Sequence, residues 1–205
     1  MIRIGGVVLC GGQSSRMGRP KAWLPFGDET LLQRVVRILR SVTDPVVVVS
    51  APGQSLPTLP VEVTVIHDHT RGQGPLEGMA TGLAALEGRA EAGFVSSCDV
   101  PFLRPAYIRR MIELLGKYAI CVPEVDGFRH PLAGIYRVEM AGIARRLLDQ
   151  GRHRPIFLFE SQPTYFAQTV EFSSADPDGA SFRNLNTPEE YTQAVTDLAQ
   201  GYGAD

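Results

Sequence analysis

The sequence has few cysteines, and none of them forms a CxxC pair. Its three cysteines, Cys10, Cys98 and Cys121, are an odd number. Each lies in or beside an apolar run, where a small buried thiol is ordinary. This pattern argues against a disulfide framework and favours a reducing compartment, so we expect a cytoplasmic protein.

Long apolar runs and clusters of basic residues are also missing. No apolar stretch approaches the roughly 20 residues that a membrane span needs. The apolar run at the N-terminus is too short and is interrupted too early to be a signal peptide. The net charge of -2 and the pI of about 6.1 offer no polybasic surface. We therefore expect neither a membrane nor a nucleic acid as a partner.

Three familiar catalytic and phosphate-binding motifs are absent as well. The chain contains no GxxxxGK[ST], no GxGxxG and no GxSxG, which excludes two common phosphate loops and a common serine nucleophile. His130 and His153 have no serine or cysteine in a nucleophile motif, so covalent catalysis is not expected. His67 and His69 flank Asp68, but two histidines without a third ligand argue against a zinc site.

Apolar runs of strand length alternate with segments of helical period over the whole chain. This alternation predicts a three-layer, mostly parallel, Rossmann-like α/β sheet with helices on both faces. A turn at 125–128 followed by an apolar run at 131–137 predicts a late antiparallel pair. The other expected strands are 4–9, 46–49, 61–66, 93–97 and 119–125. The expected helices are 31–39, 75–87, 105–115, 138–148 and 188–198, the last with a capping threonine at Thr187.

The length of 205 residues, with 44% hydrophobic and 20% charged residues, fits one globular domain. We expect this domain to span 1–200 and the tail 201–205 to be frayed. The proline-rich segment 51–60 is expected to be an exposed loop.

The segment 9–21 contains the largest group of candidate ligand-binding residues. It leaves the first expected strand and reads LCGGQSSRMGRPK. In open α/β sheets, ligands bind beyond the carboxyl ends of the strands, where this loop lies. Gly11 and Gly12 allow the backbone N–H groups to approach phosphate oxygens, and Arg16 and Lys21 supply positive charge. An ordinary strand-to-helix turn is the alternative for the glycines alone.

Asp99 follows another expected strand and should reach the same edge of the sheet. Mg²⁺ takes oxygen ligands, usually one or two carboxylates together with substrate phosphates, so one aspartate can suffice. The alternative is that Asp99 only caps the turn before Pro101.

Together, these residues make the chain resemble a known family of enzymes. The loop resembles the signature L-x-G-G-x-x-x-R-M-G, followed by a lysine, of the pyrophosphorylase-like nucleotidyltransferases. More closely, the chain resembles the molybdenum cofactor guanylyltransferase family. The match continues in the family's order through GPLEGM at 74–79, SCDVPF at 97–102, HP at 130–131 and FRNLNTPEE at 182–190.

The resemblance implies a nucleotide-diphospho-sugar transferase-like fold and transfer of GMP from GTP to the phosphate of molybdopterin. It implies nucleotide-binding roles for Leu9, Cys10, Gly11, Gly12, Arg16, Lys21, Ser50, Asp68 and Asp99. Among these, Arg16, Lys21 and Asp99 are expected to be catalytic, with Asp99 as the Mg²⁺ ligand. On the acceptor side it implies His130, Asn184 and Asn186. Transient contact with proteins that deliver the cofactor, or with recipient enzymes, would follow.

The choice of base and acceptor leaves alternatives. The related cytidylyltransferases typically have alanine where this chain has Gly11, and a missing Cβ there could leave room for a purine. Against this, Ser50 stands where asparagine is frequent, and Cys10 where alanine is usual. A molybdopterin cytidylyltransferase, a sugar-phosphate nucleotidyltransferase and a non-catalytic nucleotide-binding module therefore remain as alternatives.

Overall fold

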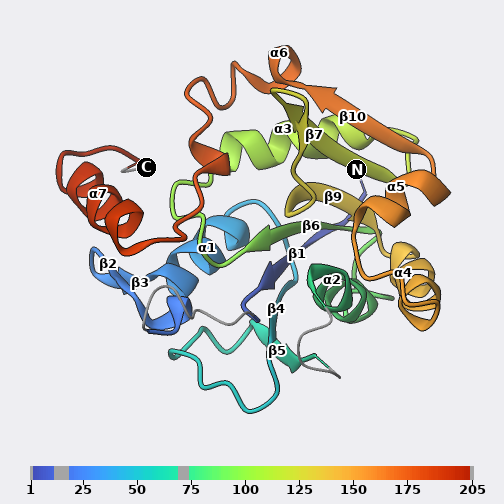
Figure 1. Cartoon of the computed structure of the whole chain (residues 1–205), viewed down its shortest axis with the longest axis horizontal. Helices are drawn as coiled ribbons and strands as arrows, with labels where there is room; N and C mark the ends of the chain where they lie inside the picture. The colour runs from blue at the N-terminus through green and yellow to red at the C-terminus, as the bar shows by residue number, and fades with distance from the viewer. Residues whose placement is uncertain (1, 12–18, 69–73, 204–205) are drawn as a thin grey trace.

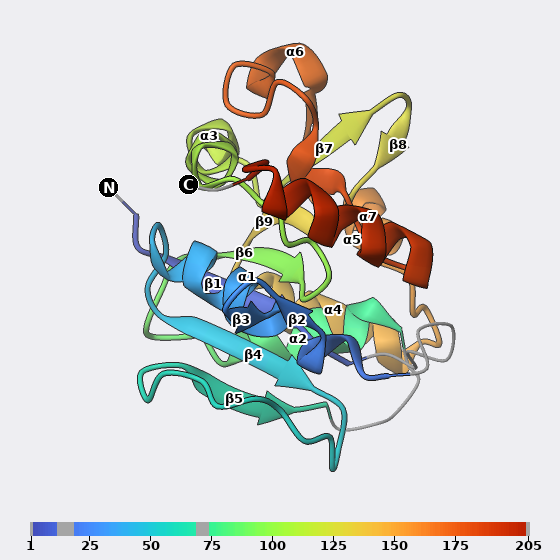
Figure 2. The same cartoon turned by 90° about the vertical axis from the view of Figure 1, so that its left-hand side faces the viewer.

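The structure is a computed structural model that describes residues 2–11, 19–68 and 74–203. Its centre is a mixed sheet with the strand order β10-β7-β9-β6-β1-β4-β5, and β8 pairs with β7 (Figures 1 and 2). The strands are β1 (Ile4–Leu9), β4 (Val46–Ser50), β5 (Thr64–His67), β6 (Ala92–Ser97), β7 (Ile120–Val125), β8 (Phe128–Arg129), β9 (Ala133–Arg137) and β10 (Thr164–Gln168). A small separate sheet pairs β2 (Pro25–Phe26) with β3 (Glu29–Thr30).

The sheet is mostly parallel, as the sequence predicts. β1 pairs in parallel with β4 and β6, β4 with β5, and β7 with β10. The late antiparallel element is also confirmed, because β8 pairs with β7 across the turn at 125–128 and β9 runs antiparallel to both β6 and β7. β9 therefore lies inside the sheet, between two strands that are parallel to each other.

Two strands differ from the prediction. The run expected at 61–66 forms a strand only over Thr64–His67, and Val61 is 94% exposed. β10 is an edge strand that the sequence analysis did not identify, and its side chains are mostly half-buried. β10 pairs only with β7, at the edge of the sheet. An edge strand is less buried than a central one, so its sequence has no continuous apolar run.

The helices form two layers. α1 (Leu31–Arg40) and α3 (Pro105–Leu115) cover one face of the sheet, and α2 (Pro75–Ala84) and α4 (Met140–Asp149) cover the other. The remaining helical segments are η1 (Lys21–Trp23), α5 (Ile156–Ser161), α6 (Thr169–Phe172), η2 (Ala180–Phe182) and α7 (Pro188–Ala199). Within residues 2–11, 19–68 and 74–203, no helix is both long and apolar enough to cross a membrane.

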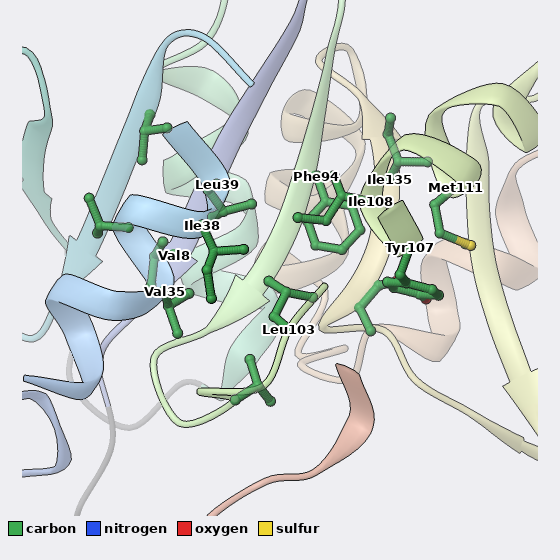
Figure 3. Packing of buried hydrophobic residues seen from close by; sticks show 14 of the residues in the cluster. Val8, Val35, Ile38, Leu39, Phe94, Leu103, Tyr107, Ile108, Met111 and Ile135 are labelled. Carbon is green, nitrogen blue, oxygen red and sulfur yellow. The ribbon is translucent and has the colours of Figure 1, made fainter. Parts of the chain in front are cut away.

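Neighbouring residues of the central strands serve opposite layers. Val8 and Phe94 pack with α1 and α3, and Figure 3 shows them among residues of these helices. Val7 and Val95, one position away, pack with α2 and α4. Because successive side chains point to opposite faces of a sheet, continuous apolar strands are buried on both sides.

Side-chain caps begin two of the helices. Thr30 and Gln33 form a reciprocal capping box at α1, and Thr187 and Glu190 form one at α7, which begins at Pro188. The capping pattern at Thr187 therefore acts as the sequence predicts.

The described residues of the tail, 201–203, contact the rest of the domain. The Tyr202 ring contacts Phe102 with a centroid distance of 5.0 Å, and its hydroxyl donates to Asp178. Arg34 donates to the Gly203 carbonyl. These contacts hold residues 202 and 203 against α1 and the segments that bear Phe102 and Asp178.

Gly82 allows α2 to lie close to the sheet, and we expect Gly82→Ala to destabilise the protein. An added Cβ would lie 2.3 Å from Cγ1 of Val7 and 3.1 Å from Cγ2 of Val49. Alanine normally stabilises a helix interior by about 1 kcal/mol relative to glycine. Overpacking should reverse the sign, to a loss of about 1–3 kcal/mol in the free energy of unfolding, measured by urea denaturation.

Gly142 provides the matched control for this experiment. It lies on an exposed position of α4, and the nearest atom to its added Cβ is Nη1 of Arg146 at 3.9 Å. Gly142→Ala should leave stability unchanged or raise it. Equal stability of the Gly82→Ala variant and the wild type would show that α2 can move away from β1 without loss.

Candidate active site

Part of the predicted site lies at the carboxyl ends of β1, β4, β5 and β6, which bear Leu9, Cys10, Gly11, Ser50, Asp68 and Asp99. The Cys10 N–H donates to the Val49 carbonyl at 2.7 Å, and the Cys98 N–H donates to the Leu9 carbonyl at 3.1 Å. The Asp68 N–H donates to the Ser50 carbonyl at 2.9 Å. The parallel register thus carries the ends of all four strands to one edge of the sheet, where ligands bind in open α/β folds.

Asp99 and Lys21 form an ion pair at this edge. Nζ of Lys21 lies 2.6 Å from Oδ2 of Asp99, and the two side chains are 18% and 12% exposed. The other carboxylate oxygen, Oδ1, accepts a hydrogen bond of 2.6 Å from the Ser97 hydroxyl. Both oxygens therefore have a partner that holds the carboxylate in one orientation, and partial burial strengthens these charged contacts.

A third segment closes the cluster from the far end of the chain. Nζ of Lys21 also donates to Oδ1 of Asn186 at 3.0 Å, and the Leu185 N–H donates to the Asp99 carbonyl at 3.0 Å. The resemblance placed Asn186 on the acceptor side, whereas here its amide contacts the lysine of the nucleotide side. Ser97, Lys21, Asp99 and Asn186 form one polar cluster, which we call the Lys21–Asp99 cluster.

The donor set of this cluster fits a hard cation. Carboxylate oxygens are ligands that Mg²⁺ prefers, and one or two carboxylates suffice when phosphates complete its shell. Among the residues that the structure describes, no group of three or more histidine, cysteine, aspartate or glutamate side chains forms a metal site.

Gly11 lies against the neighbouring loops. A Cβ on Gly11 would be 3.4 Å from the Ala51 nitrogen and 3.4 Å from Oδ2 of Asp68. Gly78 of α2 is close to the same carboxylate, because its Cβ would lie 3.6 Å from Oδ1 of Asp68. Asp68 therefore sits between Gly11, just after β1, and the first turns of α2, and its contact with the nucleotide stays a prediction.

Ser50 and Gln54 add polar contacts that the sequence analysis did not anticipate. Ser50 is fully buried, and its hydroxyl lies 2.8 Å from Nδ1 of His67. The Gln54 side chain, in the segment expected to be an exposed loop, is bonded to Cys10 and Ala51. Only its position four residues after a strand end could have indicated it.

The other two expected acceptor residues, His130 and Asn184, are associated with Phe182 by a ring contact and by sequence. The His130 ring packs against Phe182 with a centroid distance of 5.0 Å, and burial lowers the pKa of His130, which favours the neutral imidazole. Asn184 is exposed, two residues before Asn186. The contact with Phe182 connects His130 to the chain segment that supplies Asn186.

Two predicted residues lie outside the part of the chain that the structure describes. Gly12 and Arg16 belong to the segment 12–18, so their roles stay predictions.

The cysteines of the site are buried thiols. Cys10 and Cys98 follow the neighbouring strands β1 and β6, and both are 6% exposed. A hydrogen bond with the Cys10 side chain, together with burial, raises the pKa of Cys98 well above its ordinary value. A thiol with a raised pKa is a poor nucleophile, which agrees with a reaction that needs no covalent intermediate.

Comparison with known proteins gives a consistent result. Residues 6–164 match the MobA-like NTP transferase domain. A protein of Mycobacterium avium (strain 104) named a probable molybdenum cofactor guanylyltransferase is 43% identical over 190 residues, which cover 91% of this chain and 92% of that protein.

Solved structures agree on the fold. The molybdopterin-guanine dinucleotide biosynthesis protein A of Archaeoglobus fulgidus has a TM-score of 0.78 at 21% identity, with 96% of this chain and 99% of that chain covered. A Mycobacterium tuberculosis H37Rv protein solved in complex with manganese, Rv0371C, has a TM-score of 0.65 at 21% identity, with 95% and 98% covered. At this identity the likeness is one of fold.

Proposed function

This chain belongs to the MobA-like NTP transferases, in the molybdenum cofactor guanylyltransferase family, and from that premise we propose that it transfers GMP from GTP to the phosphate of molybdopterin. The enzyme is a nucleotidyltransferase, and the other product is pyrophosphate. The observation that carries the proposal is the Lys21–Asp99 cluster at the sheet edge that also bears Gly11. Its placement supports the joining of a triphosphate and a cation at one point.

The proposed reaction is an in-line attack by an acceptor phosphate oxygen on the α-phosphate of GTP. Such a transfer asks the protein mainly to position two anions and to stabilise the negative charge that develops. In this proposal the Lys21 ammonium balances charge on the phosphates, and Asn186 holds that ammonium in place. Ser97 orients the Asp99 carboxylate, and the backbone at Gly11 approaches the nucleotide.

A divalent cation, which we propose to be Mg²⁺, would be held by Asp99. The carboxylate chemistry supports this assignment, because carboxylate oxygens are ligands that Mg²⁺ prefers. In the structure these oxygens contact Lys21 and Ser97, so the ion would take over one of those positions. When bound, such an ion neutralises charge on the phosphates. The manganese in the related structure of Mycobacterium tuberculosis is consistent with a divalent metal in this fold.

Gly11 supports the choice of GTP over CTP. A Cβ at Gly11 would make contacts of 3.4 Å, which are at the lower limit of ordinary van der Waals contact. The described fold therefore accommodates alanine with little change. The glycine is better explained by the ligand, because a Cβ would occupy space beside Asp68 where a purine is proposed to lie.

The three free cysteines fit a reducing compartment, which supports a cytoplasmic reaction.

A transfer assay with purified molybdopterin tests this proposal. The enzyme is incubated with Mg²⁺ and GTP, CTP, ATP or UTP, and both pyrophosphate and the dinucleotide product are measured. We expect the product to form with GTP at a rate well above those for the other three nucleotides. A preference for CTP would make the protein a cytidylyltransferase. Release of pyrophosphate only with a sugar phosphate would assign a different acceptor, and no release with any acceptor would indicate a binding module.

The product of this reaction has to be passed to another protein. We therefore propose transient contact with proteins that deliver the cofactor or with recipient enzymes. Comigration with such a partner, dependent on the dinucleotide product, would support this part of the proposal.

A further inference from the structure

The Gln54 carboxamide bridges two backbone groups from neighbouring strand ends. Its Oε1 accepts from the Ala51 N–H at 3.1 Å, and its Nε2 donates to the Cys10 carbonyl at 3.1 Å. A backbone N–H can only donate and a carbonyl can only accept, so these partners determine which way the amide faces. Ala51 follows β4 and Cys10 follows β1, at the edge that bears the Lys21–Asp99 cluster.

An amide in this orientation has the same hydrogen-bonding face as the lactam edge of guanine. In guanine, O6 accepts and the adjacent N1–H donates, as Oε1 and Nε2 of Gln54 do here. Adenine and cytosine present the reverse pattern, an amino donor beside a ring nitrogen acceptor. The pair formed by the Ala51 N–H and the Cys10 carbonyl therefore matches a base with a keto group beside an N–H.

We propose that this backbone pair reads the lactam edge of the nucleobase, and that Gln54 is a specificity-determining residue that competes with the base for it. The inference rests on the proposed function, because it assumes that the nucleotide binds at this edge. The base takes both hydrogen bonds from the carboxamide, so a keto purine leaves neither backbone group unsatisfied. A base with the reversed edge would place donor against donor and acceptor against acceptor, which is strongly disfavoured.

A groove next to Gln54 can receive its side chain when the base displaces it. Gln54 itself lines this groove of about 410 Å³, whose other lining residues include Leu56, Pro57, Leu59, Val63 and His67. The half-buried side chain therefore contacts both this groove and the backbone pair. Rotation of its side chain into the groove exposes the pair without a change in the sheet.

The state of Ser50 supports reading by the backbone. This residue is fully buried, and its hydroxyl is bonded to His67. The serine hydroxyl is thus already engaged by a residue of the neighbouring strand β5. The adjacent backbone groups of Ala51 and Cys10 are therefore the polar atoms suited to meet the base.

Equilibrium binding of nucleoside triphosphates to the full chain tests this inference. Inosine triphosphate retains the lactam edge, whereas 2,6-diaminopurine riboside triphosphate retains the 2-amino group but has the reversed edge. We expect the wild type to bind GTP and inosine triphosphate at least about a hundredfold more tightly than the diaminopurine analogue. Gln54→Ala should tighten the binding of GTP and inosine triphosphate by about tenfold, because the competitor is removed.

Controls separate competition from structural damage. Gln193→Ala removes an exposed glutamine of α7 that contacts Asp197, and it should bind GTP like the wild type. Weaker GTP binding by Gln54→Ala, with an unchanged thermal unfolding temperature, would show that Gln54 supports the binding site and does not compete with the base. That result would overturn the inference. Equal affinity of the two purine analogues would overturn it as well.

Failure of the proposed function would look different. A wild type that binds GTP through its lactam edge but forms no dinucleotide with molybdopterin would contradict the transfer reaction and leave the base-reading inference standing. Transfer from GTP, with Gln54→Ala binding GTP more weakly, would support the reaction and contradict the inference.

Discussion

Asp99→Ala is expected to lower the turnover of nucleotidyl transfer by at least about a hundredfold. The Asp99 carboxylate is oriented by Ser97 and lies 2.6 Å from the Lys21 ammonium, so it is a preorganised charge at the proposed site of the cation. Loss of one such electrostatic group typically lowers kcat by about 10²- to 10³-fold. Steady-state turnover with GTP and molybdopterin over a range of Mg²⁺ concentrations measures the effect.

The stability of this variant has to be measured separately. The Asp99 and Lys21 side chains are 12% and 18% exposed, so removal of the carboxylate leaves a poorly solvated ammonium group and weakens the fold. Asp99→Asn, which keeps the shape, should also lose turnover. The rates are compared at a temperature where unfolding experiments show every variant to be folded.

Glu62→Ala is the matched control for Asp99. Glu62 also pairs with a cation, Arg40, at 3.1 Å, but its side chain is 64% exposed and lies away from the Lys21–Asp99 cluster. Exposed ion pairs contribute little to stability, so this variant should keep the turnover of the wild type. Wild-type rates from Asp99→Ala as well would remove Asp99 from the mechanism.

Lys21→Ala should produce a loss of similar size, at least about a hundredfold in turnover. The Lys21 ammonium donates to both Asp99 and Asn186, which fixes one positive charge at the edge of the sheet. Its removal takes away the charge that is proposed to balance the phosphates. Lys21→Arg should not restore activity, because a planar guanidinium does not reproduce the two contacts of a compact ammonium group. Pyrophosphate release under saturating GTP measures both variants.

Lys117 offers a matched control for this experiment. It is the other lysine of the chain, and it is exposed before the amino end of β7, at the opposite edge of the sheet from the site. Lys117→Ala should therefore turn over at the wild-type rate. If Lys21→Ala and Lys117→Ala were equally active, the charge of Lys21 would have no part in the reaction.

The core of the fold was predictable because its signals are local. Val7 and Val8 pack on opposite faces of the sheet, so β1 is apolar without interruption, and such a run is readable from the sequence. The capping threonine at Thr187 and the turn at 125–128 are also short patterns. Asp99 and Lys21 could be placed at one edge because parallel strands end together.

Contacts between distant segments could not be predicted in this way. Asn186 meets Lys21 across 165 positions, and β9 lies between β6 and β7 because of pairing choices that no local period encodes. β10 was not predictable from a local pattern, because an edge strand that is only partly buried needs no continuous apolar run.

The sequence by itself determined the layered α/β architecture and the residue types at the edge of the sheet, since periodicity and strand-end position are properties of short segments. Only the tertiary structure decided which of those residues touch. It brought Asn186 to Lys21, Ser97 to Asp99, and the Gln54 carboxamide to the backbone of Cys10 and Ala51. The physical reason is that a hydrogen bond depends on distance and orientation in space, which the register of the sheet and the paths of its loops establish.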